Sequence, residues 1–280
     1  ADLIWAAADQ RTRGFLLGGT AGRTTLNGEG LQHEDGHSHL MSATVPNCYS
    51  YDPTFACELA VIIHDGLRRM YVEQEDIFYY ITLMNENYDQ PALVEGSEAD
   101  ILKGMYLFKK GSNSKKPRVQ LLGSGTIFIE VIAAAQLLHD DWGIEADVWS
   151  CPSFTELARD GQSCERWNRL HPTEKPRTTH IARCLDDTQG PIVAATDYMR
   201  AFAEQIRPWV KRPYTVLGTD GFGRSDTRAN LRSFFEVDRY HVTVAALNAL
   251  AQGGEFDAAK VEVAIAKYNI NPDATAPWLI

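Results

Sequence analysis

Three of the eight histidines, His33, His37 and His39, lie within one short polar segment. That segment, residues 28–39, reads Gly-Glu-Gly-Leu-Gln-His-Glu-Asp-Gly-His-Ser-His, so the imidazoles are interleaved with carboxylates and glycines. Imidazole titrates near neutral pH, and neighbouring imidazoles can donate to a developing oxyanion, accept a proton or hold a carboxylate. This combination of residue types predicts a segment that handles a substrate.

The histidine segment allows two other interpretations. A zinc site needs three or four ligands with defined outer partners, and Gly36 interrupts the helical His-x3-His spacing, which disfavours zinc. A histidine beside a glycine turn can also simply satisfy a buried carbonyl, although three together favour chemistry. Gly28, Gly30 and Gly36 predict a loop with tight turns, and polar loops held between packed elements commonly carry function.

Length and charge limit the class of protein. The 280 residues are enough for one large or two ordinary domains. A formal net charge of −10 with interspersed signs argues against a nucleic-acid partner and against an anionic membrane surface. No apolar run approaches the length of a membrane span, so no membrane association is expected.

Cysteine usage indicates the compartment. The chain has an odd number of cysteines and no Cys-x-x-Cys pair. Such usage is typical of reduced thiols and predicts a cytoplasmic protein. The cysteines are Cys48, Cys57, Cys151, Cys164 and Cys184.

Residues 1–90 alternate short apolar runs with helical patterns. This alternation predicts part of a parallel α/β sheet. A turn-rich and then lysine-rich stretch predicts a linker over 91–117, followed by a second α/β unit over 118–280. In the first unit, helices are expected over 2–13 and 54–71, and strands over 15–19, 43–50 and 77–83.

Two glycine-rich turns of the second unit are similar to ligand-binding motifs. Gly123-Ser124-Gly125 lies between a strand and a helix, but Phe128 stands where a dinucleotide fingerprint has its third glycine. A close strand-to-helix turn is therefore favoured over NAD binding. The turn over 218–226 precedes a helix, where capping by Ser225 or Asp226 is favoured over an anion site. Strands are expected over 119–122, 147–150, 192–196 and 214–218, and helices over 126–141, 154–170 with a loop near Gly161, 198–210, 227–235, 242–251 and 256–267.

The longest motifs resemble one enzyme family. They are the 28–39 segment, Ser153-Phe154-Thr155-Glu156-Leu157-Ala158-Arg159-Asp160-Gly161, Tyr79-Tyr80-Ile81-Thr82 and the segment 217–226. Together they resemble the homodimeric E1 component of bacterial pyruvate dehydrogenase complexes over essentially the whole chain. More distantly, Glu34-Asp35-Gly36-x-x-His39 and Asp220-x-Phe222-Gly223-x-Ser225 are similar to motifs of transketolases.

The resemblance implies a fold and a place in a longer protein. The expected class is α/β: the C-terminal part of a pyrimidine-type thiamine diphosphate-binding domain, over 1–90, followed by a transketolase C-terminal-like domain. The family has a further domain upstream. The chain opens inside an amphipathic helical pattern at Ala1, without an initiator methionine, so we expect a piece cut from something longer.

The resemblance also implies an activity and its partners. The family carries out oxidative decarboxylation of pyruvate and reductive acetylation of the lipoyl group on dihydrolipoyl acetyltransferase, E2. It uses thiamine diphosphate and Mg²⁺, whose main ligands are expected upstream of this chain, and it forms homodimers. By itself the chain is expected to be inactive.

Site residues carry over by the same resemblance. His33 is expected near the cofactor and bound pyruvate, and His39 is expected to share the catalytic role. Asp35 and His37 are expected to contact the substrate. Two alternatives are a non-catalytic dimerisation or assembly module and a transketolase-type transferase, which needs nearby arginines for phosphate, where only Arg23 is close.

Overall fold

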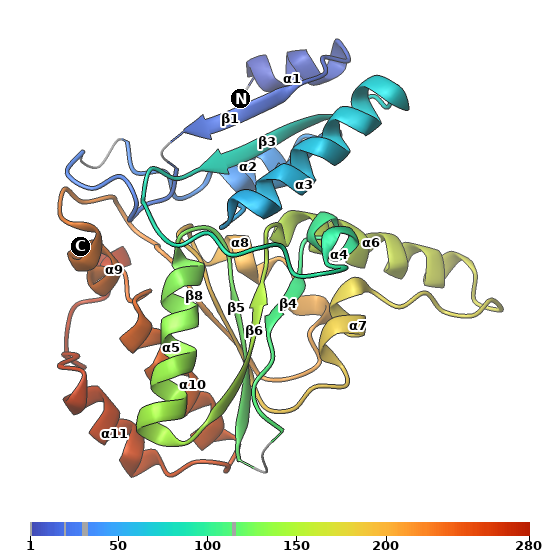
Figure 1. Ribbon diagram of the computed structural model, residues 1–280. Helices are drawn as coiled ribbons and strands as arrows, with labels where there is room; N and C mark the ends of the chain where they lie inside the picture. The colour runs from blue at the N-terminus through green and yellow to red at the C-terminus, as the bar shows by residue number, and fades with distance from the viewer. Residues whose placement is uncertain (1, 20, 30–32, 114–115) are drawn as a thin grey trace.

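The computed structural model describes residues 2–19, 21–29, 33–113 and 116–280. Its strands form two sheets (Figure 1). The smaller sheet is parallel, in the order β1-β3-β2, with β1 (Phe15–Gly19), β2 (Cys48–Tyr51) and β3 (Phe78–Leu83). The larger sheet has the order β4-β6-β5-β7-β8, with β4 (Tyr106–Lys109), β5 (Arg118–Gly123), β6 (Glu145–Ser150), β7 (Ile192–Ala195) and β8 (Tyr214–Leu217). The expected α/β class is confirmed.

The smaller sheet is covered by helices from its own half of the chain. Tyr79 and Ile81 of β3 pack in a cluster with Ile62, whereas Phe78 packs with Ala8 on the other face. This alternation follows from the two-residue period of a strand. The helices are α1 (Asp2–Asp9), α2 (Ser38–Ala43) and α3 (Ala56–Leu67), which continues into the π-helical turn η1 (Arg68–Val72).

The edge strand β1 leaves apolar surface uncovered. Leu16 is 44% exposed and Leu17 is 54% exposed, and Leu3 of the neighbouring α1 is 86% exposed. An exposed strand edge beside apolar side chains is typical of a surface that another chain segment or subunit covers.

The larger sheet is buried on both faces, as parallel sheets usually are. Val119 and Leu121 of β5 pack in one apolar cluster, and Leu122 packs in the other. Figure 1 shows α5, α10 and α11 on one side of this sheet and α6 and α7 on the other. The helices are α5 (Ile127–Trp142), α6 (Phe154–Leu170), α7 (His180–Leu185), α8 (Ala201–Glu204), α9 (Arg228–Phe234), α10 (Arg239–Gln252) and α11 (Ala258–Lys267), with the 3₁₀ turns η2 (Arg207–Trp209) and η3 (Pro277–Leu279). No helix among these described residues is long and apolar enough to cross a bilayer.

The segment expected to be a linker holds regular structure. Within 91–117 lie α4 (Glu98–Leu102) and β4, which pairs antiparallel with β6 at the edge of the larger sheet. Ile101, Met105 and Tyr106 are buried there, and their burial outweighs the turn-rich composition around them. The stretch predicted as a linker therefore contains a helix and the edge strand of the larger sheet.

Three further elements differ from the sequence expectation. The strand expected over 43–50 begins only at Cys48, because α2 takes the residues up to Ala43. The helix expected over 198–210 is divided into α8 and η2, where Pro208 lacks the N–H that a longer helix needs. The cap of α9 is Thr227, whose hydroxyl accepts a hydrogen bond from the backbone N–H of Asn230.

Gly161 does not interrupt α6, which is continuous through it. A Cβ built at Gly161 would lie 2.4 Å from Cδ2 of Trp209. The glycine therefore serves close packing of the Trp209 ring against the helix, and the expected internal loop is absent from α6.

Replacing Gly161 by alanine tests this packing. Alanine is the better helix former by about 1 kcal/mol, but the overlap with Trp209 should cost about 1–3 kcal/mol or more. We expect net destabilisation in urea unfolding, with Gln162→Ala on the exposed side as the matched control. A loop at this position would instead make Gly161→Ala neutral or stabilising.

Candidate functional site

The two sheets point the carboxyl ends of their parallel strands at each other. Asp52 follows β2, Ser124 follows β5 and Asp197 lies two residues beyond β7. The backbone N–H of Asp52 donates to the carbonyl of Pro152 at 2.6 Å, and its carbonyl accepts from Gly125 at 3.1 Å. Ligand sites of open α/β sheets form at such carboxyl ends.

Asp52 is fully buried at this junction. Its carboxylate accepts hydrogen bonds from the hydroxyls of Thr82, at 2.7 Å, and Ser124, at 2.8 Å, one from each half of the molecule. Burial raises the pKa of Asp52 to about 7, against the lowering effect of these two hydroxyls. At neutral pH this group therefore takes up and loses a proton.

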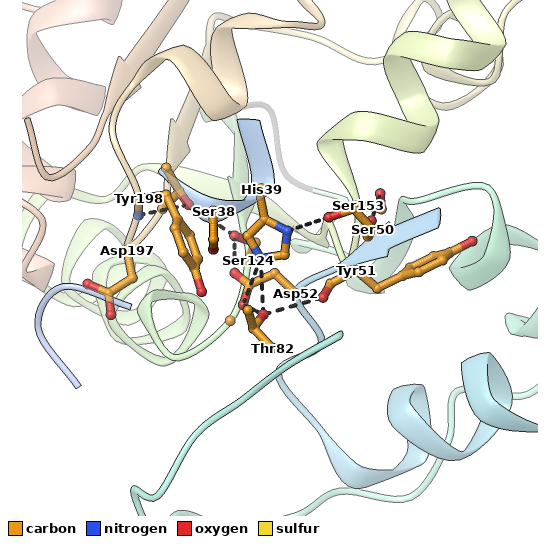
Figure 2. A network of polar contacts seen from close by, with 12 residues as sticks. Ser38, His39, Ser50, Tyr51, Asp52, Thr82, Ser124, Ser153, Asp197 and Tyr198 are labelled. Atoms are coloured by element: carbon orange, nitrogen blue, oxygen red, sulfur yellow. Dashed lines mark hydrogen bonds and ion pairs between the residues drawn. The ribbon is translucent and has the colours of Figure 1, made fainter. Parts of the chain in front are cut away.

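His39 lies beside Asp52 in the same buried network (Figure 2). Its Nδ1 is 2.6 Å from the hydroxyl of Ser50 and its Nε2 is 3.1 Å from that of Thr82. Its ring stacks on Phe202 with a centroid distance of 4.7 Å. Burial lowers the pKa of His39 to about 3, so the imidazole is neutral.

This placement of His39 differs from the catalytic role expected for it. Both ring nitrogens already have hydroxyl partners, and the side chain is 0% exposed. In this arrangement no nitrogen of His39 is free for a substrate. The geometry makes His39 a support that joins α2, β2 and β3.

Asp197 anchors the stretch over residues 22–25, which precedes the histidine segment. Its carboxylate accepts from the backbone N–H of Thr24 at 3.0 Å and from the hydroxyl of Thr25 at 2.9 Å. Gly22 has φ +88°, and a Cβ there would lie 2.2 Å from the Asp197 carboxylate, so only glycine fits. Burial raises the pKa of Asp197 to about 6, although the charge of Arg232 and the Thr24 and Thr25 contacts oppose the rise.

A cluster of side chains around Arg232 joins the stretch over residues 22–25 to the second half of the chain. Arg232 donates to the hydroxyls of Thr24, at 3.3 Å, and Thr126, at 3.1 Å, and pairs with Glu86. Its side chain is 8% exposed. Charge-assisted contacts of this kind are stronger than neutral ones, so Arg232 of α9 fixes residue Thr24 against the start of α5.

Asp35 lies in the histidine segment, three residues before helix α2, and its carboxylate binds backbone N–H groups at the start of that helix. One carboxylate oxygen accepts from the backbone N–H groups of His37 and Ser38 at 3.0 and 2.9 Å, and the other accepts from the Ser38 hydroxyl. Both oxygens are thus engaged in local structure. This differs from the expectation that Asp35 contacts the substrate.

The three histidines are not brought together. His33 and His37 are exposed, whereas His39 is buried. Gly30, Leu31 and Gln32 lie outside the described residues. Among those described, no group of three or more His, Cys, Asp or Glu side chains is arranged to hold a metal ion.

Sequence comparisons identify the relatives of this chain. Residues 1–91 match the pyruvate dehydrogenase E1 component middle domain, and residues 104–238 match the transketolase-like C-terminal domain. The pyruvate dehydrogenase E1 component of Cupriavidus necator is 68% identical over 280 residues, 100% of this chain and 31% of that protein. That of Escherichia coli K12 is 60% identical over 280 residues, 99% of this chain and 31% of that protein.

The chain is similar in sequence to pyruvate dehydrogenase E1 components over its whole length. It spans 31% of the length of these relatives. Solved transketolases share the fold: that of Leishmania mexicana has a TM-score of 0.65 at 16% identity, covering 90% of this chain and 32% of that one. A Pichia stipitis variant has a TM-score of 0.64 at 18% identity, covering 91% and 33%.

Several buried residues of this candidate site escaped the sequence interpretation. The sequence patterns assign no role to Asp52, Asp197 or Arg232, and they include Glu34 only within the motif that is similar to one of transketolases. One signal could have found Asp52 and Asp197, because each follows the carboxyl end of an expected parallel strand. Nothing local marks Arg232, because its partners are distant in the sequence.

Substituting Asp52 by asparagine tests the buried carboxyl. Between pH 3.8 and about 7 the folded chain holds the Asp52 proton and the unfolded chain does not, so stability falls as pH rises. The shift corresponds to at most about 4 kcal/mol. Asp52→Asn should therefore remove part of the pH slope of unfolding free energy, measured in urea between about pH 5 and about pH 8.

The control for this change is Asp89→Asn at an exposed position. It should leave the slope unchanged. If the slope of unfolding free energy against pH is identical in Asp52→Asn and the parent chain, the raised pKa assigned to Asp52 is contradicted.

Proposed function

We propose that this chain forms the C-terminal portion of a pyruvate dehydrogenase E1. The activity is thiamine diphosphate-dependent oxidative decarboxylation of pyruvate, with reductive acetylation of the lipoyl group of dihydrolipoyl acetyltransferase. The observation that carries the proposal is the 68% identity to a protein of that name across all 280 residues. The complete protein is accordingly an enzyme that assembles with E2.

Within that reaction, His33 and His37 are the groups of the histidine segment that reach the substrate. Both are exposed, and the backbone next to them is anchored: Glu34 accepts from Arg224, and the carbonyl of Gly36 accepts from Met199 at 2.9 Å. A rigidly held imidazole can orient a carboxylate and stabilise negative charge as it develops on a substrate oxygen. Asp35 and His39 position the backbone that carries His33 and His37 and do not contact the substrate themselves.

The described residues do not fit the metal ion that accompanies thiamine diphosphate. Mg²⁺ in such sites prefers carboxylate and carbonyl oxygens in near-octahedral geometry. The described part of this chain has no acidic or histidine cluster with that arrangement. We therefore assign the ligands of Mg²⁺ and of the diphosphate to other segments of the complete protein.

A second candidate is a dimerisation or assembly module without its own activity. A split gene transketolase described as an inactive beta4 tetramer has this fold, with a TM-score of 0.54 at 16% identity, covering 85% of this chain and 67% of that one. The exposed Leu16 and Leu17 on β1 supply apolar surface for such an assembly. We propose a homodimer for the complete protein, in the cytoplasm, where the five cysteines of this chain stay reduced.

Titration of the isolated chain with cofactor tests whether the chain is a portion that lacks the cofactor ligands or binds the cofactor by itself. We expect no binding of thiamine diphosphate with Mg²⁺ at micromolar concentration, because the ligands assigned elsewhere are missing. Isothermal titration calorimetry measures this, with the complete protein as the positive control. Micromolar affinity of the isolated chain would contradict the assignment of the cofactor ligands to other segments.

Substituting His33 by alanine in the complete protein tests the substrate role. Loss of one donor at a reacting centre typically costs roughly 10²–10³ in turnover. Because His33 is exposed, the unfolding free energy should change by no more than about 0.5 kcal/mol. Pyruvate decarboxylation and thermal unfolding are measured on the same preparation, with His64→Ala at another exposed position as control.

The opposite pattern would contradict the proposed substrate contact of His33. A buried structural histidine predicts early melting with normal turnover per folded molecule. An enzyme that behaves in that way carries its substrate contacts elsewhere.

A further inference from the structure

The turn between β8 and α9 lies against the histidine segment. The backbone N–H of Gly28 donates to the carbonyl of Asp226 at 3.1 Å, and the backbone N–H of Arg224 donates to Oε2 of Glu34 at 2.5 Å. Figure 1 shows the chain before α9 beside the loop between β1 and α2. Because Glu34 directly follows His33, this turn borders the residue that we propose to contact pyruvate.

Other contacts fix the same turn in place. The carboxylate of Asp220 accepts from the backbone N–H of Arg200 at 3.1 Å and from its Nε at 3.0 Å. Gly221 has φ +106°, and a Cβ there would lie 2.6 Å from the carbonyl oxygen of Pro277, so only glycine fits. The turn is therefore held against the start of α8 and against η3 as well as against the histidine segment.

This fixed turn presents the ring of Phe222 to solvent. Phe222 is 71% exposed and belongs to none of the apolar clusters that the described residues form. The turn η3, which packs on the neighbouring Gly221, carries two more exposed apolar side chains, Trp278 and Leu279. Single exposed apolar side chains are common on protein surfaces, but several together beside a site indicate a contact with a ligand or another chain.

The two substrates of the proposed reaction differ in the contact that they need. Pyruvate is small and polar, and its carboxylate is best bound by charged or polar donors. A lipoyl group is a dithiolane ring on a hydrocarbon chain that an amide joins to a lysine, so apolar carbon separates its sulfur atoms from the protein that carries it. Aromatic side chains bind apolar carbon well. An exposed ring beside the histidine segment therefore suits the lipoyl chain better than it suits pyruvate.

We propose that Phe222 binds the hydrocarbon chain of the lipoyl group and contributes to selection of the acyl acceptor. The ring is two residues from the Arg224 N–H that binds Glu34, and the turn that carries it is fixed before any ligand arrives. A side chain that is held in place in this way adds affinity, because little freedom is lost when the ligand binds. This inference rests on the proposed function, because it takes the lipoyl group of E2 as the acyl acceptor.

Phe222→Ala in the complete protein, supplied with thiamine diphosphate, Mg²⁺ and pyruvate, tests this contact. Two acceptors are compared: the isolated lipoylated domain of E2, and ferricyanide, which takes electrons without a lipoyl group. Relative to the ferricyanide rate, kcat/KM for the lipoylated domain should fall roughly tenfold, the size expected for loss of one aromatic contact. Phe222→Leu keeps a large apolar side chain and should retain most of this ratio.

The matched control is Tyr71→Ala, which removes another exposed aromatic side chain, on η1. It should leave the ratio of the two activities at the parent value. Equal ratios in Phe222→Ala, Tyr71→Ala and the parent protein would overturn the proposal.

The unlipoylated domain distinguishes a contact with the chain from a contact with the domain surface. As a competitor of the lipoylated domain, it should have the same inhibition constant for Phe222→Ala and for the parent protein. A parallel weakening of that constant would assign Phe222 to the domain surface and overturn the proposal. A changed oligomeric state in light scattering, with parent-like acyl transfer, would assign Phe222 to a subunit contact and overturn it as well.

The parent protein separates failure of this inference from failure of the proposed function. If the parent protein reduces ferricyanide with pyruvate and acetylates the lipoylated domain, the proposed function stands, and the Phe222 variants decide this inference by themselves. If the parent protein does neither, the proposed function fails and the lipoyl assignment fails with it.

Discussion

The fold depends on one buried carboxyl group at the meeting point of its two sheets. Asp52 takes hydroxyl hydrogen bonds from Thr82 in the smaller sheet and from Ser124 at the end of β5, while its backbone bonds to Pro152 and Gly125. An unpaired carboxylate could not be buried there, because desolvation would be far too costly. The hydroxyls and the raised pKa make burial possible, and they fix how the two sheets face each other.

That junction determines which histidines are available for chemistry. The hydroxyls that serve Asp52 also engage His39 through Thr82, so His39 becomes a neutral part of the scaffold. His33 and His37 remain exposed. A rigid interior below an exposed imidazole is the arrangement that preorganised electrostatic stabilisation requires.

Sequence patterns predicted the fold well where local signals were strong. Strand 119–122 and helix 126–141 are observed as β5 and α5, because apolar burial and glycine turns act locally there. The sequence patterns failed where tertiary contacts determine the structure. Gly161 accommodates Trp209, and β4 forms in a turn-rich stretch through pairing with β6. The histidine segment was found from composition, but the burial of His39 and the anchors Glu34 and Arg232 depend on partners far away in the chain.

The most direct test of this account is a structure of the complete protein with a non-reactive pyruvate analogue bound. The account predicts an imidazole nitrogen of His33 within hydrogen-bond distance of a carboxylate or carbonyl oxygen of the analogue. It also predicts that His39 stays buried between Ser50 and Thr82. An analogue held by His39, with His33 turned away into solvent, would contradict it.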